Sequence, residues 1–344
     1  MIEIDGAQGE GGGQVLRTSL SMSVLTGKAV HVRDIRGRRP KPGLMPQHLK
    51  AVEASASISH GRVQGAVLGS TSLYFEPGAV AGGNYHFNVG SAGAATLVLQ
   101  TIAVPLSFGK IQSCVTIIGG THVPWSPSYH YLAWHWLHYL GRSAYQIASK
   151  LVRPGFYPRG GGCLTAHIEP IDKPTPLVLG QRGTLKRVRG MSLAASLDRS
   201  IALRQQRQAQ KRLAKHCSDI DVAVLRLSSY SPGTALVLIA EFEQSQYCFA
   251  ALGARGKPAE RVADEAVDAF EAFLGTPGAI DEHLADQLVM PLSVVPGTSR
   301  LRTARITRHL LTNAEVVREF LPVDIEITGE VGAPGEIRIE GVGR

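Results

Sequence analysis

The chain has 344 residues but only four cysteines, Cys114, Cys163, Cys217 and Cys248, and no two of them form a Cys-x-x-Cys motif. Thiols spaced so widely argue against a disulfide framework and against a structural zinc site. They are typical of a reducing compartment. We therefore expect free thiols and a cytoplasmic protein.

Long hydrophobic runs are also missing. A membrane-spanning helix needs about 18 uninterrupted apolar residues, and the sequence contains no such stretch. The first residues carry no basic segment followed by an apolar one, so we expect neither a membrane span nor a secretory leader. The content of 44% hydrophobic and 19% charged residues is that of a globular protein with room for two domains. The net charge of +8 favours polyanionic partners, although a solvated basic surface explains it about equally well.

Repetition is the main feature that the sequence does have. Residues 9–28 and 90–110 each run from a glycine-rich turn through an expected helix to a Gly-Lys pair. A β-branched strand, a second helix and further strands follow in both copies. A third, shorter copy has expected helices from residue 286 and over 312–320. This alternation predicts an α/β (α+β) fold whose large domain holds three repeated βαβαββ units.

The segment between the second and third copies breaks this period. Its pattern predicts four strands and two helices, the helices over residues 198–216 and 258–274. We therefore expect a catalytic domain of residues 1–180 and 276–344, and a smaller inserted α/β domain of residues 181–275. Ten basic residues against one acid between 182 and 215 indicate a surface for RNA phosphates or a merely solubilising one. These residues are Arg182, Lys186, Arg187, Arg189, Arg199, Arg204, Arg207, Lys211, Arg212 and Lys215.

One histidine stands at an expected strand-to-helix junction. A strand ending at Thr307 and a helix over 311–320, capped by Thr312 or Asn313, place His309 between them. The amides of a helix N-terminus attract anions, and an adjacent arginine helps to hold phosphate. A histidine in this place can act as a nucleophile or as a general acid or base, or it can simply be solvated.

Two loops supply further candidates. Residues 9–14 precede a helix and offer backbone amides to a phosphate, but they have neither P-loop nor dinucleotide-binding spacing. Glu10 is an oxygen ligand suited to Mg²⁺ or Mn²⁺, and Arg17 follows one turn into the helix. Residues 36–48 hold four cations on a loop rich in proline and glycine, which favours phosphate binding. Asp286 can orient an imidazole, approach a metal or cap a helix.

Several motifs follow one another in a fixed order. They are Asp5-Gly-Ala-Gln-Gly-Glu-Gly-Gly-Gly-Gln14, Lys41-Pro-Gly-Leu44 with Gln47-His48, Gly90-Ser-Ala-Gly93 with Leu97-Val-Leu-Gln-Thr101, Phe156-Tyr-Pro158 with Gly160-Gly-Gly162, Ala285-Asp-Gln-Leu288 and His309-Leu-Leu-Thr-Asn313. Together they resemble the RNA 3′-terminal phosphate cyclases over residues 5–322. Only the inserted segment matches loosely.

The resemblance implies an ATP-dependent enzyme that converts an RNA 3′-phosphate end to a 2′,3′-cyclic phosphodiester and releases AMP and diphosphate. The nucleophile of the family aligns with His309, which would form a covalent histidine–AMP intermediate. AMP would then pass to the RNA, giving RNA(3′)pp(5′)A, and the neighbouring 2′-OH would expel it. The implied partners are ATP and RNA with a 3′-phosphate end. A homodimer is left open.

The resemblance also suggests roles for other residues. Phosphate charge would be stabilised by Arg17, Arg36, Arg39 and Gln47; a divalent metal, Mg²⁺ or Mn²⁺, would be held by Glu10; and ATP would be bound by Gln100, Pro127, His283, Asp286, Gln287 and His309. Asp286 and Gln287 would position the histidine and the α-phosphate, and Pro127 and His283 would enclose adenine. Three features depart from the family pattern. His283 replaces a frequent Tyr, Pro154 replaces an Arg or His, and adjacent Arg38 and Arg39 leave the loop register open.

Two other functions compete with this one. A non-catalytic, cyclase-like RNA-binding ribosome assembly factor would keep the fold and the basic surface without needing a nucleophile. His309, Arg17 and Glu10 together weigh against it. An enolpyruvyl transferase is also built from βαβαββ repeats, but one three-unit domain with a foreign insert does not fit that class.

Overall fold

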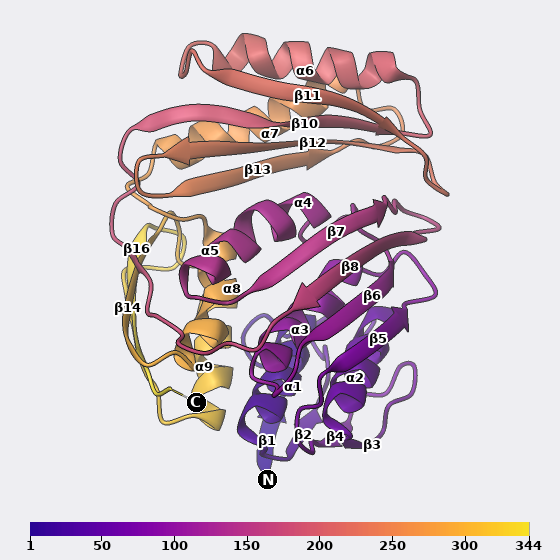
Figure 1. Cartoon of the computed structure of the whole chain (residues 1–344), viewed down its shortest axis with the longest axis vertical. Helices are drawn as coiled ribbons and strands as arrows, with labels where there is room; N and C mark the ends of the chain where they lie inside the picture. The colour runs from indigo at the N-terminus through magenta and orange to yellow at the C-terminus, as the bar shows by residue number, and fades with distance from the viewer. Residues whose placement is uncertain (344) are drawn as a thin grey trace.

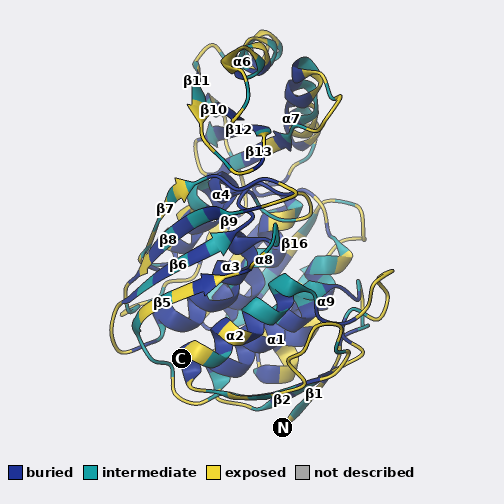
Figure 2. Cartoon of the chain, turned by 90° about the vertical axis from the view of Figure 1, so that its right-hand side faces the viewer, coloured by how far each residue is buried: buried dark blue, intermediate teal, exposed yellow. Residues whose placement is uncertain are grey.

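A computed structural model of the chain describes residues 1–343. It contains four sheets of four strands each, three in a large lower body and one in a smaller upper body (Figure 1). Helices occupy the centre of the lower body, and the sheets lie around them (Figure 2).

The first repeat forms a sheet with strand order β1-β2-β4-β3. Strands β1 and β2 are parallel, and the other two pairs are antiparallel. The elements of this repeat are β1 (Ile2–Asp5), α1 (Gly13–Thr26), β2 (Val30–Arg33), α2 (Pro46–Ser59), β3 (Arg62–Gln64) and β4 (Leu73–Glu76).

The second repeat has the same topology, with strand order β5-β6-β8-β7. Its second helix is split into three pieces, the middle one π-helical, and Ser128 caps it by accepting a hydrogen bond from Tyr131 N–H at 3.2 Å. The elements are β5 (Gly83–Asn88), α3 (Ala95–Ser107), β6 (Ser113–Gly119), α4 (Tyr129–Tyr131), η1 (Leu132–Trp136), α5 (Leu137–Arg142), β7 (Ile147–Arg153) and β8 (Gly162–Ile168).

The third repeat is divided by the insertion. Its first strand has only two residues and pairs in parallel with β14, more than 100 residues later. The elements are β9 (Val178–Leu179), α8 (Glu282–Ser293), β14 (Gly297–Thr303), α9 (Arg308–Phe320), β15 (Asp324–Thr328) and β16 (Gly335–Gly341). The strand order β9-β14-β16-β15 again gives one βαβαββ unit. The predicted fold class, with three such units, is therefore confirmed.

The insertion forms a sheet of order β11-β10-β12-β13 with two helices on one face (Figure 2). Its elements are β10 (Leu185–Ala195), α6 (Arg199–Leu213), β11 (Ile220–Leu227), β12 (Gly233–Phe242), β13 (Gln246–Leu252) and α7 (Ala259–Leu274). One core lies between the helices and the sheet and includes Leu236, Phe249 and Phe270. The other face of the sheet packs on η1 through Val237 and Cys248. The domain limits at 181 and 275 stay a prediction.

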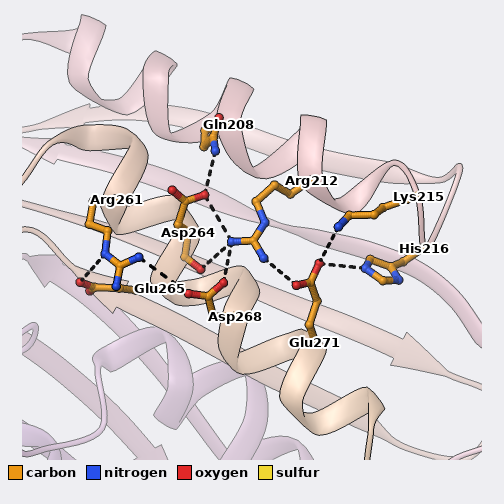
Figure 3. A network of polar contacts seen from close by, with 9 residues as sticks. All are labelled: Gln208, Arg212, Lys215, His216, Arg261, Asp264, Glu265, Asp268 and Glu271. Atoms are coloured by element: carbon orange, nitrogen blue, oxygen red, sulfur yellow. Dashed lines mark hydrogen bonds and ion pairs between the residues drawn. The ribbon is translucent and has the colours of Figure 1, made fainter.

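Two of the basic residues of α6, Arg204 and Arg212, are neutralised by neighbouring carboxylates. Helix α7 runs beside α6 and supplies the carboxylates, as Figure 3 shows. Arg212 pairs with Asp268 at 2.7 Å and with Glu271 at 2.6 Å, and Arg204 pairs with Glu260 at 2.7 Å. The acids were absent from the predicted basic segment only because they lie about 50 residues further along the chain.

Helix α9 begins earlier than predicted. Thr307 is its N-cap, and its side chain accepts a hydrogen bond from Leu310 N–H at 3.1 Å. The predicted caps Thr312 and Asn313 were wrong. Thr312 donates to the carbonyl of Arg308 inside the helix, and Asn313 is buried between helices.

Candidate active site

The loops that precede helices α1, α2, α3 and α9 meet at one place. A Cβ atom at Gly9 would lie 1.8 Å from Thr312 Oγ1 of α9, and one at Gly13 would lie 2.3 Å from His48 Nε2 of α2. The side-chain oxygen of Gln47 accepts a hydrogen bond from the N-cap amide of α3 at 3.0 Å. The backbone amides of helix N-termini favour anions, so this place suits phosphate groups.

His309 lies in the first turn of α9 and contacts the first turn of α1. Its Nδ1 lies 2.7 Å from Oε1 of Gln14. Because an amide oxygen only accepts hydrogen bonds, Nδ1 carries the proton and the lone pair of the neutral ring is on Nε2. The sequence had suggested Asp286 for this orienting role. No hydrogen bond between Asp286 and His309 occurs among residues 1–343, and Gln14 makes the contact.

The charges around His309 keep it neutral. Burial is the largest cause that lowers its pKa, and Arg39, His283 and Arg17 lower it further, while Glu10 acts in the opposite direction. These four residues were all candidates from the sequence, and the fold brings them near the imidazole. At neutral pH the ring is therefore uncharged, and its available Nε2 lone pair can act as a base or a nucleophile.

Arg17 is the most deeply placed cation of the site. Burial lowers its pKa to about 10, and Asp286 offsets part of this effect. Arg17 is therefore still protonated at pH 7. A cation with so little water around it interacts strongly with phosphate oxygens. Asp286 is buried in turn, and burial raises the pKa of its carboxyl well above the usual value.

The arginines of the loop over residues 36–48 make different contacts. Arg36 Nη1 donates to the carbonyls of Lys41 at 2.6 Å and Gly43 at 2.9 Å, so this side chain holds the loop together. Arg38 donates to the carbonyl of Gly9 at 3.0 Å and joins the two loops. Arg39 extends toward the start of α1, with Nη2 3.8 Å from Glu10 Oε2. Of the two adjacent arginines, Arg39 is thus the one near His309.

Gln47 and His48 open helix α2. His48 Nδ1 accepts a hydrogen bond from Met45 N–H at 3.1 Å, which leaves the proton on Nε2. Burial, followed by Arg17 and Arg36, lowers the pKa of His48 to about 3, so the ring is neutral. Its Nε2–H group adjoins Gly13 and Arg17, where it adds a hydrogen-bond donor to the site.

Helix α8 is fixed by a buried polar network. Its N-cap Asp281 accepts hydrogen bonds from His135 Nε2 at 2.7 Å and from Tyr131 Oη at 3.1 Å. Further along the helix, the carbonyl of Asp286 accepts a bond from Asn313 Nδ2 at 2.6 Å, and Asn313 Oδ1 accepts one from Thr18 at 2.6 Å. This amide therefore ties α8, α9 and α1 together.

The residues suggested for ATP lie on α3, α8 and the loop before α4. Gln100 Nε2 donates to Gln287 Oε1 at 2.9 Å, which joins two of them directly. The carbonyl of Pro127 accepts a hydrogen bond from Thr96 at 2.9 Å, and His283 is exposed in the first turn of α8. The adenine sandwich between Pro127 and His283 stays a prediction.

No ready-made metal cage is present. Within residues 1–343, no three His, Cys, Asp or Glu side chains stand together as a metal site. Glu10 is the carboxylate that acts on the pKa of His309 among the described residues. Mg²⁺ commonly uses one or two carboxylates together with substrate phosphates and water, so Glu10 fits a metal that arrives with a nucleotide.

Comparison with known proteins shows the family of this chain. The family model of RNA 3′-terminal phosphate cyclase matches residues 8–327. RNA 3′-terminal phosphate cyclase of Pyrobaculum neutrophilum is 39% identical over 99% of both chains, and that of Pseudomonas fluorescens is 43% identical over 95% of this chain and 94% of its own. The chain belongs to this family of enzymes. The resemblance found in the sequence is therefore confirmed.

One solved structure is also similar. The enolpyruvyl transferase NikO from Streptomyces tendae aligns with 99% of this chain and 48% of its own, at a TM-score of 0.42 and 10% identity. No function follows from similarity at that level. None of the described helices of this cyclase-family chain has the length and apolar character needed to cross a membrane.

Two residues of the site, Gln14 and His48, stood in the family-like motifs of the sequence, but no catalytic or binding role was predicted for them. Gln14 is 295 positions from His309, and only the packing of α1 on α9 brings them together. His48 stood next to a suggested ligand, but its role depends on a tautomer that no sequence pattern encodes. Besides the motifs, Gly13 offered a signal, since a side chain there would collide with His48.

Proposed function

We propose that the chain converts an RNA 3′-phosphate end to a 2′,3′-cyclic phosphodiester, with ATP as co-substrate and His309 as the residue that carries AMP. The hydrogen bond between His309 Nδ1 and Gln14 is the observation that supports this most directly. It leaves Nε2 unprotonated and pointing away from its orienting partner, which is what an attack on phosphorus requires.

In the first step, Nε2 of His309 attacks the α-phosphorus of ATP, a P–N bond forms, and the P–O bond to diphosphate breaks. The proton on Nδ1 stays in place, so the ring becomes cationic, and the Gln14 oxygen stabilises it. Arg17 and Arg39 face the negative charge that develops on the phosphate oxygens. The loss of diphosphate needs no proton from the histidine.

In the second step, an oxygen of the RNA 3′-phosphate attacks the AMP phosphorus, the P–N bond breaks, and His309 returns to the neutral form. In the third step, the 2′-OH oxygen attacks the RNA phosphorus, the P–O bond to AMP breaks, and the hydroxyl proton passes to water. Covalent catalysis of this kind replaces a poor leaving group, an oxide, by AMP. A divalent metal held by Glu10 would neutralise charge on the ATP phosphates.

The proposal is tested with ATP labelled at the α-phosphate and Mg²⁺ or Mn²⁺, in the absence of RNA. Wild type should acquire a label that is labile in acid and stable in alkali, and His309→Asn should acquire none. His86→Asn, an exposed histidine on β5, is the matched control and should label like wild type. An unlabelled but folded wild type at millimolar ATP would favour the RNA-binding assembly factor.

A further inference from the structure

The exposed aromatic side chains of this protein are not scattered. The chain has three tryptophans, nine tyrosines and nine phenylalanines. In the part that the structure describes, only Trp125, Tyr157 and Tyr230 are exposed, at 100%, 71% and 57%. They stand on three loops, between β6 and α4, between β7 and β8, and between β11 and β12.

These three loops lie side by side at one edge of the junction between the two bodies, on the right in Figure 1. The amides of Thr121 and His122 donate to the carbonyl of Gly155 at 2.9 and 3.0 Å, which joins the first loop to the second. The amide of Arg159 donates to Ser231 Oγ at 3.0 Å, which joins the second to the third. The aromatic residues therefore share one surface.

Trp125 combines an unfavourable backbone conformation with an exposed apolar side chain. Its φ of +64° lies in the left-handed region that residues with a Cβ rarely adopt, and its side chain is fully exposed to water. The loop is nevertheless anchored on both sides. Ser126 donates to the carbonyl of Val123 at 3.1 Å, and the Pro127 carbonyl is bonded to α3. A rigid loop that presents an indole to solvent suits a partner that stacks on it.

The charge around these loops has one sign. Residues 77–168, which contain the first two loops, include no aspartate and no glutamate. Arg153 lies 4.3 Å from the centre of the Tyr230 ring and donates to the Gly161 carbonyl at 2.9 Å. Arg159 is exposed, and no ion pair engages it within residues 1–343. Aromatic faces combined with unpaired cations are the ordinary means of holding single-stranded nucleic acid.

The surface adjoins the active site. Gly160 packs so closely on the turn before α3 that a Cβ atom there would lie 2.6 Å from the Ser91 carbonyl. The same turn leads to Ala94, whose amide is bonded to Gln47. A strand whose 3′-phosphate reaches His309 can thus place its preceding nucleotides on the aromatic loops.

We propose that Trp125, Tyr157 and Tyr230 form a stacking platform for the unpaired bases that precede the RNA 3′-end, with Arg153 and Arg159 holding their phosphates. The proposal rests on the proposed function, since it assigns a place to the body of the same substrate. A protein partner would need acidic side chains to match these cations, but RNA presents both bases and phosphates to them.

The test measures binding of a dye-labelled, single-stranded 12-mer with a 3′-OH end, which binds without reacting. Loss of one stacked base weakens binding about 5- to 100-fold, so Trp125→Ala should raise Kd by a factor in this range, and Trp125→Phe should restore most of the affinity. In cyclisation, Trp125→Ala should raise KM for a 3′-phosphorylated 12-mer and leave kcat unchanged. Ile111→Ala, another exposed side chain but at the opposite end of β6, should bind RNA like wild type.

Equal Kd values for wild type and Trp125→Ala would overturn the platform, as would a change in oligomeric state that accounts for any difference. Labelling by ATP without RNA is unaffected by the platform and serves as the separate readout. A wild type that binds RNA through Trp125 but does not label would reject the proposed function and keep the platform. One that labels but binds RNA independently of Trp125 would reject only the platform.

Discussion

Two regions of the molecule are rich in arginine, and they treat its charge in opposite ways. On α6, Arg204 and Arg212 pair with carboxylates of α7, and Figure 3 shows the network around Arg212. Around His309, Asp286 acts on Arg17 and Glu10 lies 3.8 Å from Arg39, but neither arginine has a close two-pronged carboxylate partner in the described chain. Burial, and after it the charges of Arg39 and Arg17, lower the pKa of the imidazole. Charge density in the sequence was higher on α6, but two of its arginines are neutralised by carboxylates of α7. The proposed function places the substrate phosphates at the cations around His309.

Among the substitutions that test this comparison, we expect the largest effect at Arg17. Arg17→Gln removes a nearly desolvated cation from the phosphate site, so histidine adenylation should fall about 100- to 1,000-fold. The melting temperature should change little, because burial of this charge is itself unfavourable. Labelling rates and thermal unfolding measure the two effects. Normal adenylation by a folded Arg17→Gln protein would remove Arg17 from the site.

Burial, together with the charges of Arg17 and Arg36, also predicts a pH effect at His48. Its pKa is about 3 in the folded protein against 6.5 for an ordinary histidine. Between these values the unfolded state binds a proton that the folded state does not, so stability contributed by His48 is complete above pH 6.5 and is lost as pH falls toward 3. The full slope is about 1.4 kcal/mol per pH unit.

His48→Gln removes this proton difference. Its free energy of unfolding should therefore fall less steeply than that of wild type between pH 6 and 4, by about 1 kcal/mol per pH unit. Urea unfolding at several pH values measures the slopes. Parallel curves for the two proteins would mean that His48 is solvated and that neither burial nor Arg17 and Arg36 lower its pKa.

Much of the fold was accessible from the sequence because the repeats are local patterns. The inserted helices and strands follow apolar periodicity, and the predicted bounds of the helices differ little from α6 and α7. Strand β9 was missed because two residues form a strand only when β14 pairs with them. The cap of α9 was misplaced because Thr307 and Thr312 are equally good caps in isolation, and packing of Asn313 against α8 decides between them.

The candidate site was less accessible, for a physical reason. Motifs named His309, Arg17 and Glu10, but Gln14 reaches His309 only through the contact of α1 with α9. Arg36 looked like a free phosphate ligand, and in the structure its Nη1 holds loop carbonyls. The carboxylates that neutralise α6 likewise come from a distant helix. Pairing across long sequence separations is a property of the fold, and composition within one segment does not report it.

Substitution in the ion-paired region between α6 and α7 should lower stability and leave adenylation unchanged, the opposite of what we expect at Arg17. Arg212 is mostly buried between α6 and α7 and contacts three carboxylates, so Arg212→Met leaves them without a partner. We expect a loss of stability of about 1–3 kcal/mol with adenylation unchanged. Arg207→Met on the same helix is the matched control, because Arg207 is exposed and forms no ion pair within residues 1–343. Equal melting temperatures for the two variants would show that the network contributes nothing.

The smallest expected effects come from substituting exposed cations of α6, where, within residues 1–343, Arg204 is ion-paired and Arg207 and Lys211 are not. Arg204 forms a two-pronged pair with Glu260, and exposed pairs contribute about 0.2–1 kcal/mol, so Arg204→Gln should lower stability slightly. Arg207 and Lys211 lie on the outer side of the helix without acidic partners in the described chain. Arg207→Gln combined with Lys211→Gln should leave stability as it is and flatten the salt dependence of binding to long RNA by up to about two phosphate contacts. Filter binding at several salt concentrations measures this slope. If Arg204→Gln changed the salt dependence more than the double variant, the paired cation and not the unpaired ones would contact the RNA phosphates.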